Sequence, residues 1–208
     1  MELATLRDLY IDELKDIYSS ESQIIKALPK MAKAATSSAL QGGFIKHLEE
    51  TKVHVQRLDQ IFSKLKVSPT GKKCKATEGL LKEGAELMEE DANPEVMDAG
   101  LICAAQKVEH YEIASYGCVR TYAKLLGEDE AVALLQTTLD EEAATDKKLT
   151  GLAGEINIEA NSDHDASDPD DNDSTQAVSG KPKVKARTNA ANDHKGASMA
   201  MANPTKKR

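Results

Sequence analysis

The segment KVEHYEIASY, residues 107–116, carries two carboxylates at positions where a buried helix normally carries apolar side chains. A helix of 3.6 residues per turn places six residues of this region on one stripe, namely Ile102, Ala105, Glu109, Glu112, Tyr116 and Val119. Two inward carboxylates repel each other, and each loses several kcal/mol of solvation unless a cation compensates it. Bound protons, a Lys or Arg from another helix, or a metal ion could supply that charge.

Three other predicted helices each carry an inward carboxylate, and these are Glu21, Glu50 and Glu142. Four to six carboxylates with one or two imidazoles, meeting in a helical core, form the ligand set of a dinuclear iron or manganese centre. We therefore expect two metal ions, iron or manganese, held by residues from the set Glu21, Glu50, His54, Glu109, Glu112, Glu142 and Asp146. His54 is either a ligand or a group packed behind the ligands, whereas His47 and His110 are expected at the surface or behind the ligands.

The composition favours an all-α protein. The chain has 208 residues with 3% aromatics and no Trp, and Ala, Leu, Glu and Lys are abundant. Its net charge of -8 argues against a body that binds nucleic acid. The three cysteines form no CxxC pair, which indicates neither a disulfide framework nor a thiolate zinc site and fits a reducing cytoplasm. We expect Cys103 and Cys118 to fill the core and Cys74 to lie in a loop.

Helical periodicity divides the first part of the chain into four long helices and one short one. Their predicted ranges are roughly residues 3–35, 44–65, 77–90, 94–126 and 128–156. Pro29 should kink or split the first helix near Ala27. Ser37 to Gly43 should form a turn, and Thr77 should cap the short helix. The expected fold is a ferritin-like up-down four-helix bundle, in which the short fifth helix belongs to a long crossover.

The last part of the chain has a different composition. From about residue 158 an acidic low-complexity run is followed by a basic one, and neither can bury enough apolar area to offset its ordering entropy. We therefore expect a bundle domain over residues 1–157 and a disordered tail over residues 158–208. The neighbouring acidic run can bind the basic end, so a nucleic-acid partner is not expected. No apolar run approaches the roughly 20 residues that span a bilayer, so the chain should be soluble with no membrane partner.

Four segments carry a family resemblance, namely DLYIDELKDIYSSESQI, HLEET, AAQKVEHYEIASYG and EEAATDKKL. They resemble the ferritin-like stress proteins of the YciE/YciF family, which are related to the rubrerythrins, over roughly residues 4–156. The resemblance implies metal-binding carboxylates at Glu21, at Glu50, at the Glu109 and Glu112 pair and at Glu142. Ferritin-like sites usually carry Glu-x-x-His on two helices. In this chain Val53 and Thr145 stand at those histidine positions, and His54 and Asp146 come one residue later.

Two classes of function follow from these patterns. In the first, a carboxylate-bridged metal pair oxidises Fe(II) with oxygen or peroxide during stress. In the second, the bundle is a non-catalytic stress protein whose metal site is structural or lost. Because no CxxC pair is present, the chain has no rubredoxin-like electron-transfer domain, and electrons would come from another molecule.

Apolar residues in excess of one bundle core predict an assembly. The first helix carries Leu3, Leu6, Leu9 and Tyr10, and the crossover helix carries Leu80, Leu81 and Leu87. Exposed apolar patches of this kind usually mark an interface. We expect a homodimer in which the crossover helix of one chain packs near the first helix of the other. The alternative is a monomer whose own crossover helix covers these leucines.

Overall fold

The computed structural model describes residues 3–162, which form five helices and no strands within that range. The helices are α1 (Leu6–Ala34), α2 (Ser38–Leu65), α3 (Lys75–Leu87), α4 (Pro94–Leu125) and α5 (Asp129–Ser162). The all-α fold class and the bundle with a crossover helix are confirmed. The predicted disordered tail falls, from residue 163 onward, outside the described residues, and α5 itself continues past Asn157.

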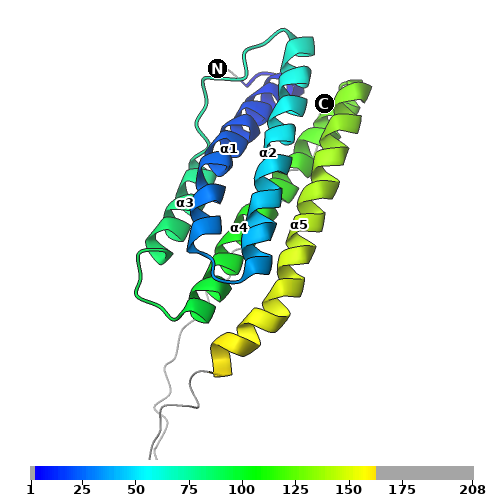
Figure 1. Ribbon diagram of the computed structural model, residues 1–208. Coiled ribbons are helices and arrows are strands. Elements are labelled where there is room, and N and C mark those ends of the chain that lie inside the picture. The colour runs from blue at the N-terminus through cyan, green and yellow to red at the C-terminus, as the bar shows by residue number, and fades with distance from the viewer. Residues whose placement is uncertain (1–2, 163–208) are drawn as a thin grey trace, which may run out of the picture. The chain divides into compact units, whose positions relative to one another are not determined.

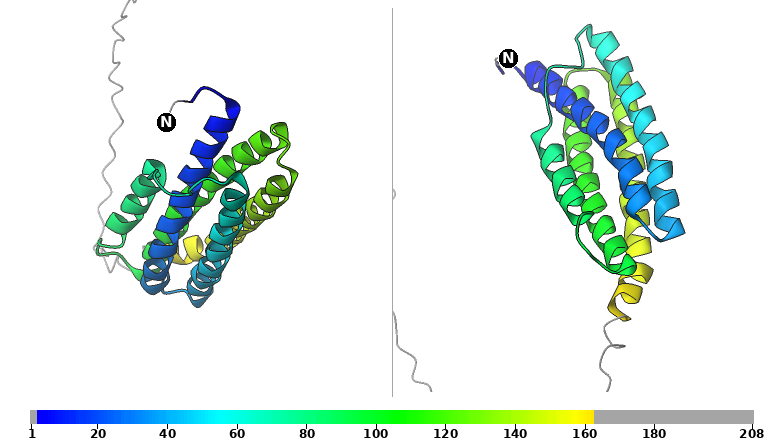
Figure 2. Two further views of the ribbon diagram at one scale, coloured as in Figure 1. Left: turned by 90° about the horizontal axis from the view of Figure 1, so that it is seen from above. Right: turned by 60° about the vertical axis from the view of Figure 1, so that its left-hand side comes forward.

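The long helices form two antiparallel pairs, α1 with α2 and α4 with α5 (Figure 1). The segment between Leu65 and Pro94 carries the chain from one end of the bundle to the other, so α2 and α4 run in the same direction. Within this crossover, α3 lies outside the four-helix arrangement and packs on α4 and α1 (Figure 2). This single long crossover is typical of ferritin-like bundles.

The start of α2 differs from the prediction. The helix begins at Ser38 and includes Gly42 and Gly43, which the sequence analysis placed in a turn. Asp98 of α4 explains the early start, because its buried carboxylate accepts hydrogen bonds from the backbone N–H groups of Thr36 at 2.8 Å and Ser37 at 2.6 Å. Ser37 in turn caps the helix by accepting from the Leu40 N–H group. The turn is therefore short and lies before the glycines.

Local sequence signals predicted some of the other helix boundaries correctly and others incorrectly. α1 continues through Pro29, so it is not split there. Pro94 opens α4, and Gly127, with φ of 73°, follows its end as predicted. At α3 the prediction of Thr77 as the cap is wrong, because Cys74 occupies the N-cap position and its sulfur accepts from the Thr77 N–H group.

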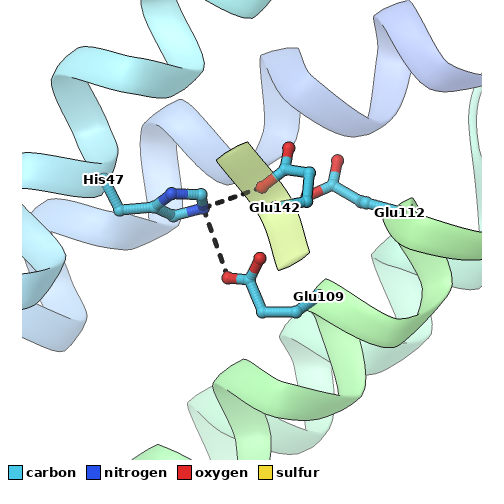
Figure 3. Close-up of side chains that lie close together, drawn as sticks. All are labelled: His47, Glu109, Glu112 and Glu142. Carbon is cyan, nitrogen blue, oxygen red and sulfur yellow. Dashed lines mark ion pairs between the residues drawn. The ribbon is translucent and has the colours of Figure 1, made fainter. Parts of the chain in front are cut away.

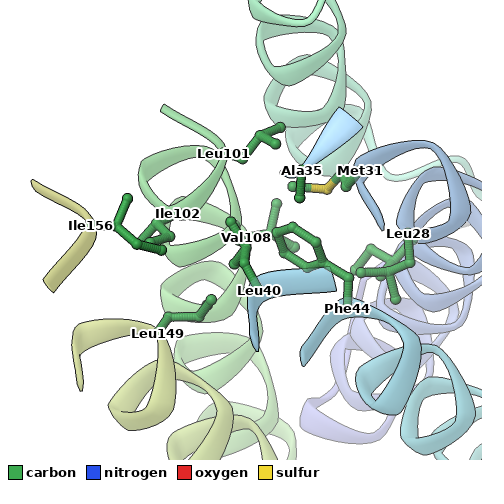
Figure 4. Packing of buried hydrophobic residues seen from close by; sticks show 12 residues of the cluster. Leu28, Met31, Ala35, Leu40, Phe44, Leu101, Ile102, Val108, Leu149 and Ile156 are labelled. Carbon is green, nitrogen blue, oxygen red and sulfur yellow. The ribbon is translucent and has the colours of Figure 1, made fainter. Parts of the chain in front are cut away.

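The core consists of two apolar clusters with a polar layer between them. The first cluster lies at the α1–α2 turn and includes Leu28, Phe44 and Leu149, as Figure 4 shows. The second lies towards the other end and includes Leu14, Leu58 and Leu135. Along each long helix the buried positions follow a seven-residue repeat, as in α1 with Tyr10, Leu14, Ile17, Glu21, Ile24, Leu28 and Met31. The residues of the polar layer occupy the middle of that repeat.

Candidate metal centre

Carboxylates from three helices meet in the polar layer at the middle of the bundle. α4 contributes Glu109 and Glu112, which are 3% and 1% exposed, while α1 contributes Glu21 and α5 contributes Glu142, both fully buried. Each stands at a core position of its helix, within the row of buried side chains. The stripe predicted for α4 is therefore buried, with both carboxylates pointing inward.

Two histidines of α2 complete the layer. His47 places Nε2 3.3 Å from Glu109 Oε1 and 3.9 Å from Glu142 Oε2, and Figure 3 shows its ring pointing between these carboxylates. His54, two turns further along, places Nδ1 3.0 Å from Glu142 Oε1 and 3.4 Å from Glu21 Oε1. Both imidazoles are buried. The six side chains together offer only oxygen and nitrogen donors.

Potential ligand atoms fall into two groups, within each of which all atoms lie within 4.8 Å of one another. One group contains His47, Glu109, Glu112 and Glu142, and the other contains Glu21, His54 and Glu142. Because Glu142 belongs to both, its two oxygens face two adjacent positions. Each of these two groups could hold a metal ion, and Glu142 could contribute to both.

Most of these donor atoms have no hydrogen-bond partner among residues 3–162. This is true of Oε2 of Glu21, Glu109 and Glu112, of both Glu142 oxygens, and of His47 Nε2 and His54 Nδ1. The imidazole nitrogens lie at ion-pair distance from the carboxylates but are not aligned as hydrogen bonds. Buried polar atoms are almost always paired, because an unpaired one costs about 1–3 kcal/mol. Seven such atoms at one point fit a site built for cations.

The electrostatics of the layer lead to the same conclusion. Burial raises the pKa of Glu109 and Glu112 well above the usual value, and repulsion from Glu142 and Glu21 raises it further. Burial also raises the pKa of Glu21, although the adjacent His54 imidazole acts in the opposite direction. For His54, burial would lower the pKa, but the adjacent carboxylates of Glu142 and Glu21 outweigh it and raise the pKa to about 10. Without a metal, the layer must therefore hold protons, whereas two dications would match its four carboxylates.

A second set of groups holds the inner side chains in place. Outside the layer, Nε2 of His54 lies 2.9 Å from Oε2 of Glu141, which also pairs with Arg57. This leaves Nδ1 of His54 facing the carboxylates. A metal-binding histidine typically contacts a carboxylate through its other nitrogen in this way. On the opposite side, Ser20 donates to Glu112 Oε1 at 3.1 Å, and Tyr116 donates to Glu21 Oε1.

Two of the seven predicted ligands lie outside this cluster. Glu50 is partly exposed, pairs with Lys46, and places Oε2 3.9 Å from Nδ1 of His47. It therefore stands behind His47, much as Glu141 stands behind His54. Asp146 faces away from the layer, where it accepts a hydrogen bond from Gln106 at 3.0 Å and lies 3.2 Å from Nε2 of His110. The structure brings together Glu21, His54, Glu109, Glu112 and Glu142.

The sequence analysis missed His47, which it placed at the surface or behind the ligands. The signal was the seven-residue repeat of α2, where Leu40, Phe44, His47, Thr51, His54 and Leu58 alternate at spacings of four and three. His47 and His54 are seven residues apart, so they occupy the same place in this repeat and both face inward. Glu50 precedes the inward position that Thr51 occupies. Counting glutamates on α2 instead of following its apolar residues led to Glu50.

A continuous chain of polar side chains connects Glu112 with the outer face of α1. Ser20, which donates to Glu112, lies 2.7 Å from the Thr77 hydroxyl, and Thr77 accepts from the Cys74 thiol at 3.3 Å. Cys74 in turn lies 3.1 Å from the Tyr111 hydroxyl, which donates to Asp16 at 2.6 Å. Cys74 lies in the loop before α3, as predicted, and is buried there, whereas Cys103 and Cys118 are exposed, so the prediction that these two fill the core is wrong. The crossover buries Cys74 by placing it at the start of α3 against α1.

Residues 5–161 match the family described as Domain of unknown function (DUF892). This chain belongs to the DUF892 family. The resemblance to YciE/YciF proteins is thereby confirmed, because the chain is 49% identical to Protein YciF of Escherichia coli strain K12 over 156 residues, which cover 74% of this chain and 93% of that protein.

Solved structures agree with this membership. The crystal structure of the E. coli stress protein YciF superposes with a TM-score of 0.73 at 46% identity, covering 74% of this chain and 98% of the other. YcfI from Rhodopseudomonas palustris gives a TM-score of 0.70 at 47% identity over 72% of this chain and 95% of the other. A Xanthomonas campestris protein at 18% identity, with a TM-score of 0.63 over 77% of this chain and 99% of the other, shares the fold alone. Among the five helices of this DUF892 chain, none has an apolar stretch able to cross a membrane within residues 3–162.

Proposed function

We propose that this protein binds two metal ions, iron or manganese, in the polar layer of its bundle. His47, Glu109 and Glu112 would hold one ion, Glu21 and His54 the other, and Glu142 would contact both. This assignment keeps five of the predicted ligands, replaces Glu50 and Asp146, and adds His47. Hard oxygen donors with two imidazoles suit iron and manganese better than a thiolate-binding metal.

The observation that carries this proposal is the set of seven oxygen and nitrogen atoms that lie buried at one point without a hydrogen bond. A structural salt-bridge network would instead pair its carboxylates with Lys or Arg side chains. Here the nearest guanidinium, from Arg57, binds Glu141 outside the layer. The inner carboxylates have imidazoles as their only cationic neighbours among the described residues.

We propose further that the centre supports redox chemistry in a stress response, with oxygen or peroxide as the small-molecule substrate. When bound, two iron ions would supply the two electrons that reduce one peroxide molecule. The residues around the centre have three tasks. Glu141 orients the His54 imidazole, Tyr116 holds a proton towards Glu21, and the second apolar cluster excludes bulk water from one end of the layer. The stress role rests on the E. coli relative, which is described as a stress protein.

Metal binding can be measured on the full chain after treatment with a chelator. Isothermal titration with Mn(II), or with Fe(II) under anaerobic conditions, should give two ions per chain. Glu112→Ala and Glu142→Ala should lower that number while circular dichroism shows intact helices. Glu49→Ala, at an exposed position of α2, serves as the control. Unchanged stoichiometry in both layer variants would mean that the ligands lie elsewhere.

The alternative function is a stress protein that binds metal without turnover. Oxygen consumption after Fe(II) addition separates the two, because a structural site would bind iron without consuming oxygen faster than free Fe(II) does.

We also propose a homodimer, and a cytoplasmic location in which the three free cysteines stay reduced.

A further inference from the structure

A cavity of about 290 Å³ lies between the polar layer and the first apolar cluster. Its wall is mostly aliphatic and aromatic, and includes Leu28, Met31, Phe44, Val108 and Leu149, several of which appear in Figure 4. His47 and Glu109 belong to the same wall, so the cavity reaches the candidate metal centre. Protein interiors contain few voids larger than one water molecule, and this volume approaches that of small-molecule sites.

The cavity opens between α2 and α5. The exposed residues that line it come from these helices, with Lys46 on α2 and Ala144 and Lys148 on α5, and half-exposed Gly43 of α2 lies beside them. At Gly43 an added Cβ atom would lie 3.8 Å from Nζ of Lys148, so the ammonium group stands directly over the glycine. The absence of a side chain at Gly43 keeps the opening clear.

Charges around the opening are balanced except at Lys148. Glu50 pairs with Lys46, Glu141 pairs with Arg57, and Glu109 lies 3.3 Å from His47. Lys148 has no ion-pair partner within residues 3–162. An aliphatic cavity with one uncompensated ammonium at its entrance is complementary to an amphiphile that has an anionic head.

We propose that this cavity binds the alkyl chain of a medium-length carboxylic acid, whose carboxylate pairs with Lys148. Along α1 the lining runs from Ile24 to Met31, a distance of roughly 10 Å, which limits the length of chain that fits. Burial of the hydrocarbon provides most of the affinity, and the ammonium decides which end stays at the opening. The inner end of the ligand lies near His47 and Glu109. Binding requires no metal, so it is tested separately from the metal centre.

Isothermal titration of the metal-free full chain with decanoic acid and with decanol tests the cavity. Gly43→Leu should weaken binding of both ligands by about tenfold or more, because its side chain fills the opening. Gly42→Leu is the matched control, since it gains the same helix propensity, does not line the cavity, and meets no atom within 4 Å. A second pair repeats the test on α5, with Ala144→Leu at the opening and Ala143→Leu beside it. Circular dichroism establishes that each variant is folded.

The head group is tested with Lys148→Met against Lys147→Met, an exposed neighbour that does not line the cavity. Lys148→Met should lower the affinity for decanoic acid about three- to fivefold and leave the affinity for decanol unchanged. The cavity proposal is overturned if neither ligand binds saturably, or if both opening variants bind as well as their controls. Equal binding of decanoic acid by Lys148→Met and Lys147→Met would overturn the carboxylate assignment.

Discussion

At the scale of single residues, the two histidines of α2 are the most informative. Each directs one nitrogen into the polar layer and has a carboxylate near the other, Glu141 at 2.9 Å for His54 and Glu50 at 3.9 Å for His47. Such outer carboxylates fix the orientation of a ligand imidazole and raise its basicity. Glu50, predicted from the sequence as a ligand, instead lies on the outer side of His47.

The outer carboxylate of His54 gives the first prediction. Glu141→Gln should lower metal affinity roughly 10- to 100-fold, because it removes the negative charge that orients His54 and binds Arg57. Competition with a metal-binding dye measures this change. The matched control is Asp140→Asn, an exposed residue of the same helix turn, which should bind metal like the wild type. If both variants bound metal equally well, His54 would not depend on Glu141.

The pH dependence of the metal-free protein gives the second prediction. Burial and repulsion raise the folded-state pKa of Glu109 and Glu112 above the usual value of 4.5, so the folded protein holds protons that the unfolded chain releases. Stability must therefore fall as the pH rises above 4.5. His54 acts in the same direction, because its contribution is complete below pH 6.5 and is lost as the pH rises towards 10. We expect a melting temperature that decreases from about pH 6 to about pH 9.

Bound metal should reverse this trend, because its ligands must lose their protons before they bind. Melting curves followed by circular dichroism, with a chelator and with excess Mn(II), provide the comparison. A melting temperature that rises with pH in the metal-free protein would contradict the raised pKa values of the layer.

At the scale of helices, periodicity predicted the four long elements and most of their boundaries. It succeeded because apolar side chains at spacings of three and four mark the inner face of each helix. The prediction failed where a distant residue decides the local structure. The start of α2 depends on Asp98, which is far away in the sequence, and the N-cap of α3 depends on how Cys74 packs against Ser19 and Tyr111.

Asp98 gives the third prediction, which concerns the α1–α2 turn. Asp98→Ala should reduce the free energy of unfolding by about 3 kcal/mol, because it removes three hydrogen bonds to a buried carboxylate and leaves the donors of Thr36 and Ser37 unpaired. Urea denaturation measures the change. Asp91→Ala, in the exposed loop before α4, should have little effect. A similar loss in both variants would show that the turn does not depend on Asp98.

At the scale of the whole molecule, the polar layer divides the core into two apolar clusters, and each cluster packs side chains from α1, α2, α4 and α5 against one another. The sequence predicted this layout through the carboxylates that interrupt the apolar stripes of α1, α4 and α5. It did not predict the cavity, because a void depends on how side chains of all five helices meet and not on any one pattern. In the crossover helix, Leu80 and Leu81 are half-buried against the first apolar cluster of their own chain.

The fourth prediction concerns assembly, and the apolar side chains that remain exposed point to a different surface. Leu3, just before α1, and Leu6, its first residue, are 54% and 37% exposed, and Leu125 at the end of α4 is 70% exposed. The ion pair between Arg7 and Glu128, at 3.1 Å, shows that these helix ends lie together. We expect two chains to associate through this end, since contiguous apolar surface is usually covered in solution.

Light scattering at micromolar concentration should therefore give twice the chain mass of 22.5 kDa. Leu125→Asp should return the mass to that of one chain with the helices intact, because this side chain is too exposed to contribute to the fold. Ile158→Asp is the control, since Ile158 is 71% exposed and lies near the end of α5. A wild-type mass of 22.5 kDa would favour the monomer, in which Leu80 and Leu81 of the crossover helix pack only against their own chain.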